Sequence, residues 1–377
     1  MPETRTAEVP ATEASGDRTA AAGGRRRLAG RRLVGLLAPV VVLVLLASLP
    51  YVPVDVPGLL PDRVNGPGSM QLLALCLVFG GIALSYDVLF GRTGLLSFGH
   101  ALFVAGGAYG AGVGMEHLGL TLLPALALAL VVGLVLAVVV GLVSLRVSGI
   151  AFAMVTLAFA QAAAIAVQRN PFGLTGGEEG LPLARAMVPD LLLGVLNAPY
   201  RYWLALAYLA VCWVVVAWLV GSRAGHLWAA TRENPDRVAV LGVSVYRTRF
   251  GAFLVGCLLG TLGGVAHLVV TGGVNPHTAS SELTLTLLVM VVLGGAGSRW
   301  GAVVGGVLYT YLDNRLVELA SSPAVQELPS VLRVPLSQPL FVLGAVFVVV
   351  VYFAPGGLVG ALRGHRRSAP EVTGQDG

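Results

Sequence analysis

Lysine is absent from this sequence of 377 residues, and all 24 of its basic residues are arginine. Without lysine the chain cannot form a P-loop that holds a nucleotide phosphate, a Schiff base or a serine–lysine dyad. If ATP takes part in the function of this protein, another chain must therefore bind the nucleotide.

Charged residues are also scarce, at 11% of the chain against roughly 25% in soluble domains. Hydrophobic residues make up 56%, and 50 glycines add to them. This composition excludes a soluble globular enzyme and a disordered chain, and it indicates a polytopic α-helical membrane protein. The three cysteines, Cys76, Cys212 and Cys257, lie inside apolar runs without CxxC spacing. They predict small buried side chains rather than a disulfide or a metal site.

Ten apolar runs predict membrane-spanning helices. They are 33–49, 70–90, 95–115, 121–145, 150–167, 202–220, 250–271, 283–293, 302–319 and 339–353. The first follows an arginine-rich flank, as a signal peptide does, but its length favours a retained helix. A span needs roughly 17–25 residues, so 283–293 is predicted to be broken or re-entrant. We expect an all-α protein of about ten transmembrane helices, or eight if two short ones are re-entrant.

The arginines predict the orientation of these helices. If ten spans alternate from a cytoplasmic N-terminus, 18 of the 24 arginines fall on the cytoplasmic side. This bias places both termini in the cytoplasm. We therefore predict a disordered arginine-rich tail over 1–32, a transmembrane domain over 33–357 and a second cytoplasmic tail over 358–377.

The longest cytoplasmic connection, 221–249, contains five arginines and the acidic residues Glu233 and Asp236. It predicts a short amphipathic helix broken by Pro235. Such a helix suits docking on a soluble partner. Binding to anionic lipid headgroups is the alternative; it explains the charge of this segment, but it explains less well the run REN at 232–234 followed by AVLG at 239–242.

Small and polar residues mark several candidate sites within the apolar runs. Ser97 and His100 are three positions apart, which places them on one helical face. A nucleophilic pair lacks a third residue to orient the histidine, so polar groups at a helix contact are the favoured interpretation. Thr156 lies in a later apolar run, and the polar turn from Thr175 belongs to a predicted outer loop. No catalytic residue is assigned.

A glycine-rich break follows the short eighth run, at Gly294, Gly295 and Gly297. It indicates either an interrupted helix at a transport site or a tight turn between two helices. Six isolated ionisable groups also lie near span ends, where they either line a pathway or reach the membrane surface. They are Asp87, Glu116, His267, Glu282, Asp313 and Glu318.

Together these motifs resemble the membrane-spanning permease subunits of branched-chain amino-acid ABC importers. The resemblance runs from about residue 70 to 357. In order, the motifs are GLLSFGH at 94–100 with GAY at 107–109, FAMVTLA at 152–158, LTGG at 174–177, REN at 232–234 with Ala239 and Leu241-Gly242, LGGAGS at 293–298, and PGGL at 355–358. The sequence departs from the family pattern at Glu178-Glu179, Pro235 and Arg237.

The resemblance implies a translocation pathway for leucine, isoleucine, valine or related amino acids in a bacterial cytoplasmic membrane. The matching pathway positions are Ser97, Gly99, His100, Thr156, Thr175, Gly176, Gly177, Gly294, Gly295 and Gly297. The connection 221–249 would be the coupling helix, with Arg232, Glu233, Asn234, Ala239, Leu241 and Gly242 contacting an ATPase.

The resemblance also implies the partners. They are a second similar permease, two cytoplasmic ATPase subunits, an extracytoplasmic solute-binding protein and the lipid bilayer, but no nucleic acid. ATP and magnesium would be bound by the ATPases, with no cofactor or metal in this chain. The alternatives are the same fold carrying urea, short amides or another small polar solute and, less favoured, an ion-coupled carrier or an intramembrane hydrolase.

Overall fold

The computed structural model describes residues 38–55, 60–321, 337–354 and 356–362. The chain divides into two units, residues 1–52 and 53–377, which are considered separately. The described part of the first unit holds a short apolar helix, Ala38–Tyr51, which overlaps the predicted first span and ends two residues after it. The predicted arginine-rich tail over 1–32 lies outside the described residues.

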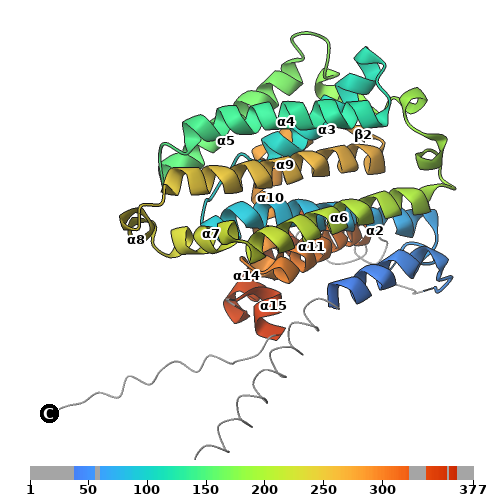
Figure 1. Ribbon diagram of the computed structural model, residues 1–377. Helices are drawn as coiled ribbons and strands as arrows, with labels where there is room; N and C mark the ends of the chain where they lie inside the picture. Colours follow the sequence, from blue (N-terminus) through green and yellow to red (C-terminus); the bar gives the residue numbers. More distant parts are fainter. Residues whose placement is uncertain (1–37, 56–59, 322–336, 355, 363–377) are drawn as a thin grey trace, which may run out of the picture. The chain divides into compact units, whose positions relative to one another are not determined.

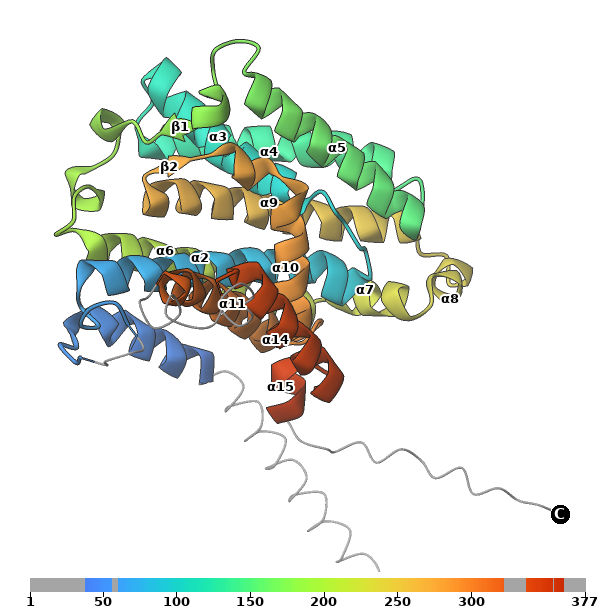
Figure 2. The same cartoon turned by 180° about the vertical axis from the view of Figure 1, so that it is seen from behind.

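The second unit is a bundle of helices (Figures 1 and 2). Its longer helices are α2 (Pro67–Asp87), α3 (His100–Leu118), α4 (Leu122–Ser144), α5 (Ile150–Arg169), α6 (Ala198–Gly221), α9 (Val245–Thr271) and α11 (Arg299–Ala320). The shorter ones are α7 (Arg223–Glu233), α8 (Pro235–Val240), α10 (Ser281–Gly294), α14 (Pro339–Phe353) and α15 (Gly357–Leu362). Single helical turns lie at η3 (Gly177–Glu179), η4 (Arg185–Met187), η5 (Asp190–Leu192) and η6 (Pro276–Ala279). Helix α15 occupies the first part of the predicted C-terminal tail.

Six helical segments in the described part of the chain are long and apolar enough to cross a membrane. They are α4, α5, α6, α9, the run Pro67–Arg92 that begins with α2, and the run Pro339–Ala361 that begins with α14. Helices α3 and α11 are comparably long but richer in glycine and polar residues. Helix α10 has 14 residues, about 21 Å at 1.5 Å per residue, which is shorter than a hydrocarbon core of roughly 30 Å. The total of ten spans and the orientation of the termini stay predictions.

Burial separates an inner pair of helices from an outer set. The most apolar window of α2 is 83% buried and that of α9 is 72% buried, against 28% for α4 and α5. Helix α2 packs on α6, α9 and α11, and α3 packs on α4 and α9. Because α4 exposes large apolar side chains such as Leu123 and Val131, its outer face suits contact with lipid.

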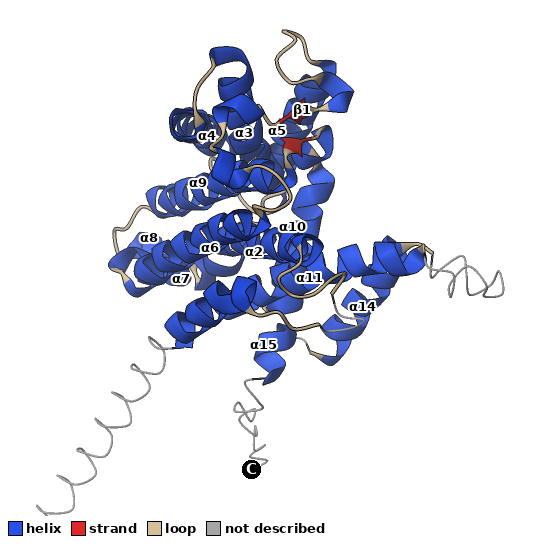
Figure 3. Ribbon diagram, turned by 90° about the vertical axis from the view of Figure 1, so that its right-hand side faces the viewer, coloured by secondary structure: helices blue, strands red, loops and turns tan. Residues whose placement is uncertain are grey.

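The two ends of helix α9 define the two ends of this unit. The pair α7–α8 lies between α6 and α9, and we call this side the α7 end. After α9, β2 (Gly273–Val274) pairs antiparallel with β1 (Leu181–Pro182), with Leu181 opposite Val274. These short strands, red in Figure 3, mark the β end, where the connection after α5 meets the end of α9.

The predicted third span begins too early. After α2 the chain forms a π-helical turn, η2 (Val88–Arg92), and then runs without helical structure over 94–99 before α3 starts at His100. The residues Leu95, Leu96 and Phe98 made this segment resemble the start of an apolar helix. A buried extended segment is equally apolar, so hydrophobicity alone does not separate the two.

Candidate functional site

The non-helical segment 94–99 and the first turn of α3 are held by side chains from three other helices. Tyr86 of α2 donates a hydrogen bond from its hydroxyl to the Ser97 carbonyl at 3.0 Å. Thr156 of α5 accepts from the Phe98 amide at 3.1 Å, and Thr284 of α10 accepts from the Ala101 amide at 2.9 Å. Buried backbone groups need such partners in an apolar interior. The three hydroxyl groups therefore fix a break between α2 and α3 inside the bundle.

Ser97 and His100 do not lie on one face of a helix, which corrects the expectation from the sequence. Ser97 precedes the helix, and its hydroxyl accepts from the Gly99 amide at 3.2 Å. The His100 Nε2 atom lies 2.9 Å from the hydroxyl of Ser85 instead. Because Ser85 donates its single hydroxyl hydrogen to the Ile82 carbonyl at 2.6 Å, His100 is the donor in this contact. This arrangement gives no support to a Ser97–His100 nucleophilic pair.

A buried carboxylate lies at the α7 end, where α2 passes into its π-helical turn. Asp87 has no exposed surface, and its Oδ1 atom accepts from the Gly297 amide at 2.6 Å. Its Oδ2 atom lies 3.4 Å from Nε of Arg92. The carboxylate thus joins the end of α2 to the turn between α10 and α11, which is 210 positions away in the sequence.

Arg232 connects helix α7 to the same place. Its Nη1 atom donates to the Gly91 carbonyl, and its aliphatic part covers Gly94. A β-carbon on Gly91 would overlap both the Asp87 carboxylate and the Gly297 amide, so only glycine permits this approach. We call Asp87, Gly91, Arg92, Arg232 and Gly297 the latch.

The predicted break at Gly294, Gly295 and Gly297 is a tight turn between α10 and α11. A β-carbon on Gly294 would overlap the backbone of Gly301, and Gly295 lies against the backbone of Gly356. Gly297 has φ +83°, a conformation that favours glycine. The glycines therefore allow close packing at the α7 end, and their lining of a pathway stays a prediction.

The pair α7–α8 confirms the predicted helix broken at Pro235. Asn234 has an extended backbone, and its side-chain oxygen caps α8 by accepting from the Arg237 amide at 3.0 Å. Trp228 and Val238 are buried and anchor the pair to the bundle. Apart from Asn234, the predicted coupling residues are exposed; these are Arg232, Glu233, Ala239, Leu241 and Gly242. Arg232 and Asn234 thus have internal contacts, whereas the other four face outward.

The predicted outer turn lies at the β end. Thr175 donates from its hydroxyl to the Val167 carbonyl at 2.7 Å, and its amide donates to the Asn170 side chain at 2.8 Å. Gly176 and Gly177 follow with positive φ. The turn is thereby held against the end of α5, at the opposite end of the unit from the latch.

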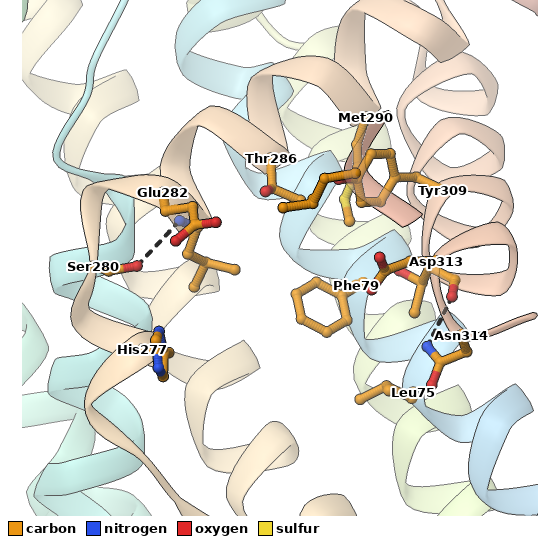
Figure 4. Close-up of a pocket in the computed structure, with 13 residues that line it drawn as sticks. Leu75, Phe79, His277, Ser280, Glu282, Thr286, Met290, Tyr309, Asp313 and Asn314 are labelled. Atoms are coloured by element: carbon orange, nitrogen blue, oxygen red, sulfur yellow. Dashed lines mark hydrogen bonds between the residues drawn. The ribbon is translucent and has the colours of Figure 1, made fainter. Parts of the chain in front are cut away.

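A cavity of about 280 Å³ lies between α2, α10, α11 and α14 (Figure 4). Its apolar wall includes Leu75, Phe79, Met290 and Leu340, and its polar wall includes His277, Glu282, Thr286, Tyr309, Thr310, Asp313 and Asn314. A neighbouring cavity of about 180 Å³ shares Phe79, His277 and Leu283 and extends to Val104 and His267. Phe79 lies near the middle of the helical run Pro67–Arg92. The cavity therefore combines a polar and an apolar wall beside the middle of this helical run.

The structure brings part of the predicted pathway set together and separates the rest. Ser97, Gly99, His100 and Thr156 meet at the break before α3, the glycines 294–297 lie at the α7 end, and the turn 175–177 lies at the β end. The sequence did not identify Ser85, Thr284 or the latch contact of Asp87. The sequence does show an isolated charge beside an apolar run at Asp87, Glu282 and Asp313. It does not show which of these carboxylates has a partner in the fold.

Comparison with known proteins gives a consistent result. Residues 69–351 match the family model described as "Branched-chain amino acid transport system / permease component". The chain is 25% identical over 265 residues to the high-affinity branched-chain amino acid transport system permease protein LivM of Salmonella typhimurium, which covers 64% of this chain and 62% of that protein. It is 30% identical over 252 residues to the probable ABC transporter permease protein y4mJ of Sinorhizobium fredii, covering 64% of this chain and 67% of that protein.

Another relative is named for a different solute. The autoinducer 2 import system permease protein LsrC of Yersinia pseudotuberculosis is 30% identical over 156 residues, covering 39% of this chain and 42% of that protein. The alignment with the LivM proteins spans 62% of their length.

Proposed function

The chain belongs to the family of permease components of branched-chain amino acid transport systems, and from this membership we propose that it forms half of the membrane pathway of an ABC importer. A second permease would supply the other half, two ATPase subunits would bind at the α7 end, and a solute-binding protein would bind at the β end. We propose leucine, isoleucine, valine or a related amino acid as the solute.

The observation that carries this proposal is the helix pair α7–α8, which is anchored to the bundle and exposes an apolar tip. Val240 is 87% exposed and Leu241 is 80% exposed, beside the exposed charges of Glu233 and Arg237. Large apolar side chains at such a tip suit contact with another protein. Trp228 and Val238 hold the pair in place, so a movement of the partner would be passed to the bundle.

The latch supplies a route for this movement. Arg232 joins α7 to the end of α2, and Asp87 joins the end of α2 to the α10–α11 turn. ATP binding would close the ATPase pair and move α7, and this would bias the bundle between two arrangements. The absence of lysine agrees with this division of labour, because a P-loop must then lie in another chain.

Leu241→Asp tests the docking step. The complex is purified from cells that express this chain with the proteins encoded beside it, and the ATPase that copurifies is measured. A charge at the tip should reduce the copurifying ATPase at least fivefold. The matched control is Leu196→Asp, because Leu196 is 93% exposed in the segment before α6. An unchanged amount of ATPase with Leu241→Asp contradicts the docking assignment.

The solute is tested separately. Labelled leucine, isoleucine, valine and urea are offered to the associated binding protein. Binding of the aliphatic amino acids supports the proposed solute. Binding of urea, a short amide or a solute such as autoinducer 2 retains the importer architecture and replaces the solute.

A further inference from the structure

The cavity between α2, α10, α11 and α14 contains two carboxylates that no described cation neutralises. Glu282 lies in the first turn of α10, and Asp313 lies two turns before the end of α11. The ion pairs among the described residues, Asp87 with Arg92 and Glu318 with Arg315, involve neither of them. Glu282 at a helix start has a favourable interaction with the helix dipole, but Asp313 has no comparable explanation.

Both carboxylates line the same cavity. Tyr309, which is almost completely buried in this wall, lines the cavity together with Asp313 and Glu282. Figure 4 shows Glu282 and Thr286 on α10 and Asp313 and Tyr309 on α11, with Phe79 of α2 beside Asp313. The remaining ionisable group of the lining is His277 on η6. Two carboxylates facing one cavity favour a cation within it.

A second observation points to a bound molecule. Thr310 is 96% buried, and its hydroxyl has no hydrogen-bond partner among the described atoms, although it lines the cavity. A helical threonine usually bonds to a carbonyl one turn earlier, and Thr261 and Thr93 do so here. An unpaired buried hydroxyl is unfavourable, and an acceptor on a molecule in the cavity would relieve it.

We propose that this cavity binds a small protonated aliphatic amine in transit, with the ammonium group at Glu282 and Asp313 and an acceptor group of the solute at Thr310. The wall formed by Leu75, Phe79 and Met290 receives the hydrocarbon part. The proposal rests on the proposed transport function and deepens it. The volume of about 280 Å³ lies at the lower limit of ligand pockets, roughly 300–1,000 Å³. An uncharged solute such as urea would leave both carboxylates without a partner.

The test uses the assembled transporter in proteoliposomes, with three probes related to leucine. They are leucine itself, 3-methylbutylamine, which lacks the carboxylate, and 4-methylpentanoate, which lacks the amine. We expect 3-methylbutylamine in large excess to inhibit leucine uptake and 4-methylpentanoate to inhibit it at least tenfold more weakly. This comparison uses the unaltered protein, so it does not depend on the folding of a variant. Equal inhibition by both probes overturns the proposal.

Near-isosteric variants test the residues. Asp313→Asn and Glu282→Gln should each lower leucine uptake at least tenfold. Thr310→Val should lower uptake severalfold, and Thr310→Ser, which keeps the hydroxyl, should restore it. Glu318→Gln is the matched control, because Glu318 lies on α11 outside this cavity and pairs with Arg315.

The outcomes separate this proposal from the proposed function. If ATPases copurify and the complex takes up leucine, but Asp313→Asn and Glu282→Gln take it up at the unaltered rate, the amine site is wrong and the importer stands. If the complex takes up only an uncharged solute, the amine site is also wrong. If no ATPase copurifies, the proposed function itself fails.

Discussion

Two regions of the bundle hold buried or half-buried carboxylates, and they treat them in opposite ways. In the latch, Asp87 is fully buried; its Oδ1 atom accepts from the Gly297 amide, and its Oδ2 atom forms an ion pair with Arg92 at 3.4 Å. In the cavity, Asp313 is half-buried and has no ion pair within the described residues. A paired charge stabilises one arrangement of helices, whereas an unpaired charge beside a cavity is available to a ligand.

The packing around the two carboxylates also differs. At the latch, Gly91, Gly294 and Gly297 bring backbones together and leave no room for another molecule. At the cavity, larger side chains from α2, α10 and α11 leave a space of about 280 Å³. We infer that the latch transmits force between elements and that the cavity holds solute. Substitutions at matched carboxylates can break this comparison.

The largest effect is expected for Asp87→Ala. Removing the buried carboxylate leaves the half-buried Gly297 amide and Arg92 without this partner, so the free energy of unfolding should fall by roughly 3 kcal/mol. Asp87→Asn keeps an acceptor for the Gly297 amide, so the free energy of unfolding of this variant should fall by less. Thermal or denaturant unfolding in detergent measures both values.

Asp313→Ala is the matched control for this prediction. Since Asp313 has no ion pair within the described residues, its removal should change the free energy of unfolding by about 1 kcal/mol or less. Equal destabilisation at positions 87 and 313 contradicts the distinction between the two regions.

Arg232→Ala should have an intermediate effect, and its neighbour Glu233 provides the comparison. Loss of the hydrogen bond from this exposed arginine to the Gly91 carbonyl should lower the free energy of unfolding by about 1 kcal/mol and lower uptake per ATP hydrolysed. Glu233 is exposed, so Glu233→Ala should stay within about 0.5 kcal/mol in stability.

The coupling ratio of the reconstituted complex separates the two roles. If Arg232 contacts the ATPase directly rather than the bundle, its variant should lose copurifying ATPase without losing stability. Retained ATPase together with a reduced coupling ratio supports the latch.

The sequence predicted the peripheral helices well and the interior less well. The predicted spans 121–145 and 150–167 differ by at most two residues at either end from α4 and α5. Lipid-facing helices need long apolar runs, and such runs are visible in sequence. The predicted start of α3 was wrong because segment 94–99 is apolar without being helical. Thr156 and Thr284, far along the chain, accept hydrogen bonds from this segment and from the first turn of α3.

Long-range pairing explains the other differences. Whether Asp87 or Asp313 has a partner depends on which residues the fold brings near, and the Gly297 amide is 210 positions from Asp87. Backbone groups carry no sequence signal as acceptors or donors. Composition could therefore identify isolated charges, but only the packed helices could separate a latch from a cavity.

The smallest effect is expected for Glu318→Ala, and it sharpens the comparison by separating pairing from burial. Glu318 pairs with Arg315 one turn earlier on α11, but the two side chains are 59% and 21% exposed, against 0% and 17% for Asp87 and Arg92. An exposed pair at this helical spacing stabilises by only about 0.2–0.5 kcal/mol, and salt screens it. Unfolding in detergent at low and high salt should therefore show a small loss that disappears at high salt. The loss from Asp87→Ala should persist at both salt concentrations, because water and ions do not reach its buried carboxylate. A loss of several kcal/mol for Glu318→Ala would mean that pairing alone, without burial, distinguishes the latch from the cavity.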